Sequence, residues 1–96
     1  MNRTSIINNY EAHLQELSVK ELQWGVLDSQ LWIGYSRELP SINKRYGISS
    51  SVKQSFAHLL KIKPDLENDF ITWNRLQIEV KQLERLCCVY KRRLDQ

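Results

Sequence analysis

The chain has 96 residues, of which 42% are apolar and 26% charged, and its formal net charge is +3. This length suits one domain with a single modest core, and the composition excludes wholesale disorder. Three glycines and two prolines are too few for the many tight turns of a β-sandwich or barrel. We therefore expect one all-α domain over residues 1–96, a small helical bundle of four to five helices with a long C-terminal helix.

Residues 4–33 show two apolar stripes at helical spacing. Either Thr4 or Ser5 is suited to cap the first turn. The first stripe follows at spacings of four, four and three, and consists of Ile6, Tyr10, Leu14 and Leu17. The second stripe consists of Leu22, Val26 and Ile33, with Trp24, Leu27 and Trp32 beside it. Because Ser18 followed by Glu21 fits a capping box, this segment is either one helix or two.

A break around residues 34–39 separates this segment from two short helices. Pro40 suits a first helical turn and Gly47 a helix end, which predicts a helix over residues 40–46. One of three consecutive serines, Ser49 to Ser51, caps the next helix. The apolar stripe of that helix is Val52, Phe56, Leu59 and Leu60. Pro64 then ends it.

The last third of the chain, from Pro64 to Leu94, has every local signal of one long helix. Acidic residues lie near its start and basic residues near its end, as the helix dipole favours. An apolar seam recurs at alternating spacings of three and four: Trp73, Leu76, Val80, Leu83, Cys87, Tyr90 and Leu94. Ile71, Ile78, Leu86 and Val89 lie off this seam. The apolar arc is too wide for a two-stranded coil, and it favours a bundle with surface left for a partner.

The sequence offers little for catalysis. His13 and His58 lie in no recognisable nucleophile, phosphate-loop or metal motif. Cys87 and Cys88 are adjacent, so on a helix they diverge by about 100° and cannot pair with each other. We expect no enzyme, no cofactor, no metal and a cytoplasmic location. We also expect no membrane association, because no signal peptide or membrane span is visible.

The segment from residue 40 to residue 62 has the outline of a helix-turn-helix, in which the second helix enters the DNA major groove. Residues 37–63 contain six basic residues and one acidic residue, a net charge of +5. The candidate DNA-binding residues are Lys44, Arg45, Ser50, Ser51, Lys53, Gln54, Lys61 and Lys63. The motif is matched imperfectly, because Asn43 replaces the usual small residue and Val52 follows Gly47 by five positions instead of six.

Two functions follow from these patterns. The first is a small regulatory protein, acting in transcription, that binds DNA through residues 40–62 and forms a homodimer through its C-terminal helix. The second is a protein-binding adaptor, chaperone or inhibitor that uses the same helix and exposed apolar surface. The candidate partner or dimer interface consists of Trp73, Leu76, Val80, Leu83, Cys87 and Tyr90. A parallel homodimer is disfavoured, because Glu79 and Glu84 would repel across it.

Overall fold

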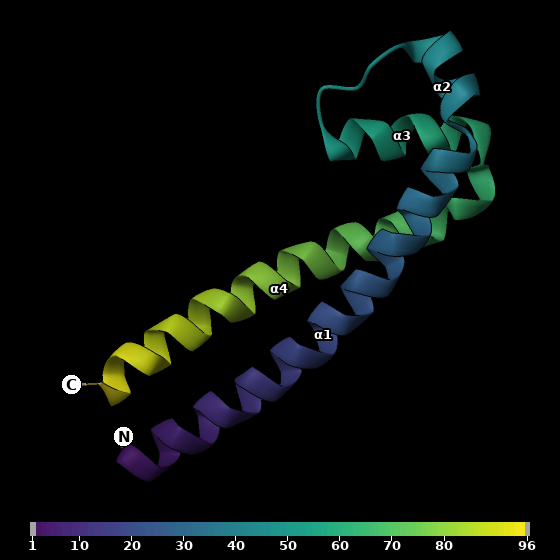
Figure 1. Ribbon diagram of the computed structural model, residues 1–96. Helices are drawn as coiled ribbons and strands as arrows, with labels where there is room; N and C mark the ends of the chain where they lie inside the picture. Colours follow the sequence, from purple (N-terminus) through teal and green to yellow (C-terminus); the bar gives the residue numbers. More distant parts are fainter. Residues whose placement is uncertain (1, 96) are drawn as a thin grey trace. The chain divides into compact units, whose positions relative to one another are not determined.

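The computed structural model describes residues 2–95. These residues form α1 (Arg3–Arg37), α2 (Leu39–Tyr46), α3 (Val52–Ile62), the 3-10 turn η1 (Pro64–Leu66) and α4 (Glu67–Leu94), without any β-strand (Figure 1). The predicted all-α class and long C-terminal helix are confirmed. Contacts divide the chain into two compact units. Unit 1 joins the segment ending at Trp24 to the segment beginning at Arg75, and unit 2 is Gly25–Asn74.

α1 is one continuous helix. It begins before the predicted caps, because the side-chain oxygen of Asn2 accepts a hydrogen bond of 2.8 Å from the backbone N–H of Ser5. Ser18 lies inside the helix, so of the two alternatives left open for residues 4–33 the single helix is the one observed. The helix extends to Arg37 and not only to the region of residue 34. Pro40 follows within the first turn of α2, where it lacks the backbone N–H that would continue the hydrogen bonds of α1.

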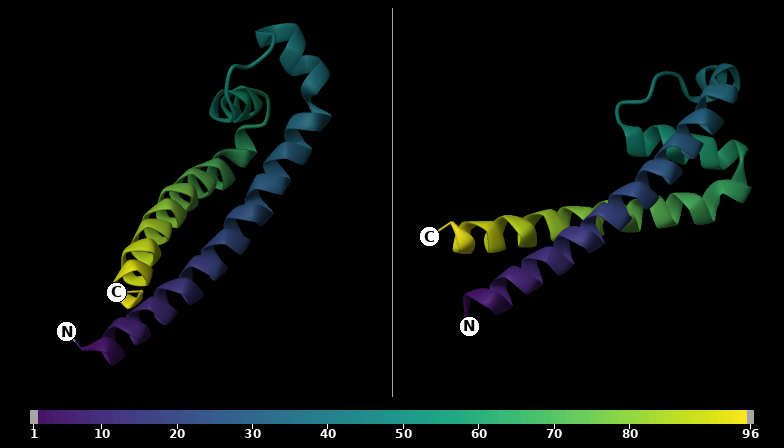
Figure 2. Two further views of the ribbon diagram at one scale, coloured as in Figure 1. Left: turned by 60° about the vertical axis from the view of Figure 1, so that its left-hand side comes forward. Right: turned by 60° about the horizontal axis from the view of Figure 1, so that its bottom comes forward.

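Unit 1 is an antiparallel pair formed by the N-terminal part of α1 and the C-terminal part of α4, which lie side by side (Figures 1 and 2). Leu83 and Cys87 of α4 are buried in the seam between them. On α1, His13 is half-buried and stacks on Tyr90, with ring centroids 5.4 Å apart. Leu14, predicted to lie on the buried stripe, is exposed instead. The seam thus selects His13, which continues the heptad spacing from Tyr10.

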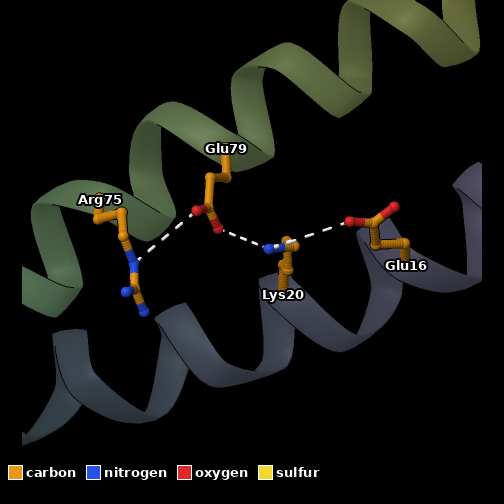
Figure 3. A network of polar contacts seen from close by, with 4 residues as sticks. All are labelled: Glu16, Lys20, Arg75 and Glu79. Carbon is orange, nitrogen blue, oxygen red and sulfur yellow. Dashed lines mark hydrogen bonds and ion pairs between the residues drawn. The ribbon is translucent and has the colours of Figure 1, made fainter.

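A polar network joins the two helices of unit 1 (Figure 3). The ammonium group of Lys20 donates a hydrogen bond of 2.6 Å to Glu79 and lies 4.0 Å from Glu16. Arg75 lies 3.8 Å from the other carboxylate oxygen of Glu79. The hydrogen bond from Lys20, followed by the positive charges of Lys20 and Arg75, lowers the pKa of Glu79 below its ordinary value, although partial desolvation opposes the shift. Glu79 is therefore held in its ionised form.

Unit 2 contains a core to which four helices contribute. Leu31 of α1, Ile42 of α2, Phe56 and Leu59 of α3, and Trp73 of α4 are all at most 3% exposed. The rings of Phe56 and Trp73 meet edge to face, with centroids 5.1 Å apart. The indole N–H of Trp73 donates a hydrogen bond of 3.0 Å to Asp28. This core fixes α2 and α3, which carry the candidate DNA-binding residues.

The second predicted stripe of α1 is not buried. Leu22 is 72% exposed, Val26 52% and Ile33 53%, whereas Leu31 is the residue of α1 that enters the core. The periodicity of α1 permits more than one apolar face, and only the positions of the other helices decide which face is covered. The stripe of α3 behaves in a similar way, because Val52 is exposed although the rest of its stripe is buried or half-buried.

The four off-seam residues of α4 are all exposed: Ile71, Ile78, Leu86 and Val89. Both long helices therefore present apolar side chains to solvent. None of the helices within residues 2–95 has the length and apolar character needed to cross a membrane.

Candidate nucleic-acid interface

The turn between α2 and α3 has the predicted glycine stop. Gly47 has a φ of +72°, a left-handed conformation that side chains disfavour, and its N–H donates a hydrogen bond of 3.1 Å to the carbonyl oxygen of Asn43. This bond satisfies a carbonyl of the last turn of α2. The next helix begins at Val52, so five residues separate the two helices.

The N-terminus of α3 is capped by its own neighbours. The hydroxyl oxygen of Ser51 accepts a hydrogen bond of 3.1 Å from the backbone N–H of Gln54. The side-chain oxygen of Gln54 accepts two hydrogen bonds of 2.8 Å, from the backbone N–H and from the hydroxyl of Ser50. These three candidate DNA-binding residues therefore hold the turn and the first residues of α3 in place.

An aromatic stack connects α2 to α3. Tyr46 and His58 lie nearly parallel, with ring centroids 4.4 Å apart, and the ammonium group of Lys61 lies 5.6 Å from the centre of the Tyr46 ring. His58 Nδ1 is also within hydrogen-bond distance, 3.2 Å, of the Ser49 hydroxyl. Sequence reasoning missed this stack. The position of His58 three residues before Lys61, on one side of the helix, was the available signal.

The basic hollow is the feature on which the candidate interface depends. Lys44 and Arg45 of α2 and Lys61 of α3 line one open hollow of about 580 Å³, together with Ser41 and Ile62. No carboxylate is among these lining residues. Three of the eight predicted DNA-binding residues are therefore brought together by the fold. Ser41 was not predicted, although it lies one turn before Lys44 on the same helix.

The outward face of α3 continues this basic surface. Lys53, Ala57 and Lys61 follow one another at spacings of four residues, and all three are exposed. Phe56 and Leu59 point to the core on the opposite side. The helix thus presents two cations with a small residue between them. The phosphate backbone of DNA can approach such a face closely.

Lys63 is not part of the basic hollow. Its ammonium group lies 3.9 Å from Glu38, and it lines a separate hollow of about 310 Å³ with Arg37 and Ile33 among other residues. The carboxylate of Glu38 offsets the positive charge of Lys63. Lys63 is thus the predicted DNA-binding residue least suited to contact a phosphate.

The predicted partner interface is occupied by the chain itself. In unit 1, Leu76, Leu83 and Cys87 are buried, and Val80 and Tyr90 are half-buried. In unit 2, Trp73 is part of the core. Burial, followed by the neighbouring thiol of Cys88, raises the pKa of Cys87, as expected for a packed cysteine. A partner could use this seam only after α1 had separated from α4.

No three side chains of His, Cys, Asp or Glu gather into a metal-binding group within the part of the chain that the structure describes. Comparison with protein families, curated proteins and solved structures found no match.

Proposed function

We propose that this chain is a small non-enzymatic regulatory protein that binds DNA through the basic surface of α2 and α3. The observation that carries the proposal is the convergence of Lys44, Arg45 and Lys61 on one hollow without a lining carboxylate. Phosphate groups favour such clusters, because each contact releases condensed counterions. Lys53 extends the same charge along the exposed face of α3.

The mode of binding is mainly contact with the phosphate backbone. Base reading requires donors and acceptors that face the groove, whereas Ser50, Ser51 and Gln54 already bond to one another at the start of α3. The imperfect match to the helix-turn-helix pattern agrees with this reading. We therefore expect strong dependence on salt and weak dependence on base sequence.

Fluorescence anisotropy with labelled duplexes tests the proposal. Three phosphate contacts predict that the logarithm of affinity falls with that of salt at a slope of about −3. Replacing Lys44, Arg45 and Lys61 with alanine should weaken binding at least about tenfold and flatten the slope. The matched control removes three cations from α4, Lys81, Arg85 and Arg92, which line a hollow that also contains Glu84.

Two results would refute DNA binding by this surface. One is absent or salt-insensitive binding of the parent protein. The other is an equal loss of affinity in the α4 control, which would show that net charge alone attracts the duplex. A duplex of shuffled sequence should bind with nearly the same affinity as the original.

A second function, binding of another protein, is favoured by the exposed apolar residues of α4. Ile78 and Val89, both in unit 1, are 53% and 44% exposed and lie about three turns apart on one face. An adaptor, chaperone or inhibitor that uses this face should capture a stoichiometric partner, and Ile78→Glu should abolish the capture. Recovery of the partner by the variant would exclude this face.

A further inference from the structure

The outer face of α4, which points away from its seam, has an excess of positive charge. Over residues 78–92 this face covers about a third of the helix circumference, given a period of about 3.6 residues per turn. It contains three exposed cations and no carboxylate: Lys81, Arg85 and Arg92. The ion pairs of α4 involve Arg75 and Glu79. Within residues 2–95, no carboxylate lies within ion-pair distance of the three cations of the outer face.

Apolar side chains lie among these cations. Ile78 and Val89 are 53% and 44% exposed, and they lie on either side of Arg85 along the outer face. The thiol of Cys88 is exposed beside them. Burial of the two aliphatic side chains against a partner would contribute hydrophobic free energy, and the surrounding cations would set the charge that the partner must carry. All of these residues belong to unit 1.

The side chains of the outer face enclose a hollow with the geometry of a helix-packing site. The hollow has a volume of about 560 Å³ and is lined by six residues: Lys81, Glu84, Arg85, Cys88, Val89 and Arg92. They form two successive sets at positions i, i+3, i+4 and i+7, the first over residues 81–88 and the second over residues 85–92. Four residues spaced in this way form the hole that receives one side chain of a facing helix. Two holes in succession fit a helix that runs along α4.

The charges around the two holes favour an acidic helix. The second hole has Arg85 and Arg92 at its ends and no carboxylate among its four residues. The first hole contains Glu84, so the six lining residues have three positive charges and one negative charge, a net charge of +2. A leucine inserted above Val89, with glutamate or aspartate one turn before and after it, would bury its own side chain and pair with both arginines.

Other occupants fit the outer face less well. Helices that bind a membrane surface keep their cations apart from the apolar face, whereas Arg85 lies between Ile78 and Val89, so insertion into lipid would bury its charge. A nucleic acid would place its phosphates beside Glu84 and leave both aliphatic side chains uncovered. A second copy that presents the same face would oppose cation to cation. An acidic helix satisfies the cations and covers the aliphatic side chains together.

We propose that the outer face of α4 binds an acidic amphipathic helix of another protein, which rests on the second function proposed above, binding of another protein through α4, and adds the chemistry of the partner. Recognition combines apolar contact at Ile78 and Val89 with ion pairs to the three cations of the outer face. Interhelical ion pairs of this kind set the choice and orientation of partners in coiled coils.

Fluorescence anisotropy with labelled synthetic peptides tests the charge of the partner. The probe is a helical peptide with leucine at heptad spacing and glutamate at the flanking positions, and its counterpart has lysine in place of every glutamate. The protein should bind the glutamate peptide, more weakly as salt rises, and should not bind the lysine peptide. Replacing Lys81, Arg85 and Arg92 with alanine should weaken binding at least about tenfold. The matched control, the alanine variant of the three cations of the basic hollow in unit 2, should bind as the parent does.

A second pair of variants separates helix docking from attraction by net charge. Val89→Lys adds a positive charge to the outer face but removes the aliphatic side chain at the second hole, so it should weaken binding of the glutamate peptide several-fold. Leu86→Lys makes the same change of charge at a residue of nearly equal exposure, 43% against 44%, that lies beside the outer face and not on it. It should not weaken binding. Circular dichroism should show the same helix content for both variants and the parent.

Equal binding of the two peptides, equal loss of affinity in the two triple variants, or tighter binding by Val89→Lys would each overturn the proposal. Binding of phosphatidylserine vesicles without binding of the glutamate peptide would assign the outer face to a membrane instead. Dimerisation of the parent in sedimentation that Val89→Lys abolishes would assign it to a second copy. A protein partner that Ile78→Glu fails to capture but the α4 triple variant still captures would overturn the acidic helix and leave the second function intact.

Discussion

Unit 2 and unit 1 use the same kind of helix but bury their side chains to different degrees. In unit 2, Ile42, Phe56 and Leu59 are fully buried, because short helices cross the long ones and cover the core from several sides. In unit 1 the helices meet along a single seam. Leu83 and Cys87 retain 7% exposure there, and the facing α1 residues are only half-buried. Two helices alone leave most of each surface in contact with solvent.

This difference indicates where stability and binding surface reside. A side chain enclosed on all sides gains the full transfer energy of burial, so unit 2 should depend strongly on single core residues. A side chain in a single seam is covered on fewer sides, so its burial contributes less free energy. Unit 1 adds the interhelical bond between Lys20 and Glu79. Its incomplete burial is also typical of elements that remain available for further association.

The largest expected effect is in the core of unit 2. Phe56→Ala should lower the free energy of unfolding by about 3–5 kcal/mol, because it removes a fully buried ring that contacts Trp32 and Trp73. Urea titration followed by tryptophan fluorescence measures the change. Val52→Ala, at an exposed position one turn earlier, should cost less than about 0.5 kcal/mol. A loss below about 1 kcal/mol for Phe56→Ala would contradict the assigned core.

An intermediate effect is expected along the seam of unit 1. Leu83→Ala should cost about 2–3 kcal/mol, near the lower end of the range for buried leucine, because the seam is covered on fewer sides. Leu86→Ala makes the same change on the same helix at a residue that is 43% exposed, and it should cost less than about 0.5 kcal/mol. Thermal unfolding followed by circular dichroism compares the two. Equal losses would mean that the seam has been assigned to the wrong face.

The smallest expected effect concerns the polar network of unit 1. The pKa of Glu79 is lowered in the folded chain, so its stabilisation is present above the unfolded pKa, near 4.5, and is lost as the pH falls through the folded pKa. Glu79→Gln should therefore be slightly less stable than the parent at pH 7. This gap in the free energy of unfolding should disappear in acid. Glu84→Gln, at an exposed position on the same helix, is the control. Urea titrations at several pH values measure the gap, and a gap independent of pH would contradict the network.

Sequence reasoning identified the elements best where local chemistry decides them. Gly47 ends α2, Ser51 caps α3 and Pro64 follows the end of α3, as predicted, because capping and backbone restriction act over a few residues. The start of α4 differs slightly, since Pro64 lies in a 3-10 turn before the helix begins at Glu67. The single domain and the helical bundle stay predictions, because contacts group the chain into two units.

The candidate site was predictable only in part. Clustering of positive charge between residues 37 and 63 was visible in the sequence, and it drew attention to Lys44, Arg45 and Lys61. That these three share a hollow whereas Lys63 pairs with Glu38 depends on how α2 and α3 are packed. The role of Gln54 in capping also depends on the geometry of the turn.

By itself the sequence determined the all-α class, the long C-terminal helix and most helix ends, because helical period and capping are local properties. The tertiary structure alone decided which apolar face of each helix is covered. It buried Leu31 and exposed Leu22 on α1, and it placed His13 in the seam instead of Leu14. A helix with two apolar stripes has no local means of choosing between them, and the choice follows from the helices that pack against it.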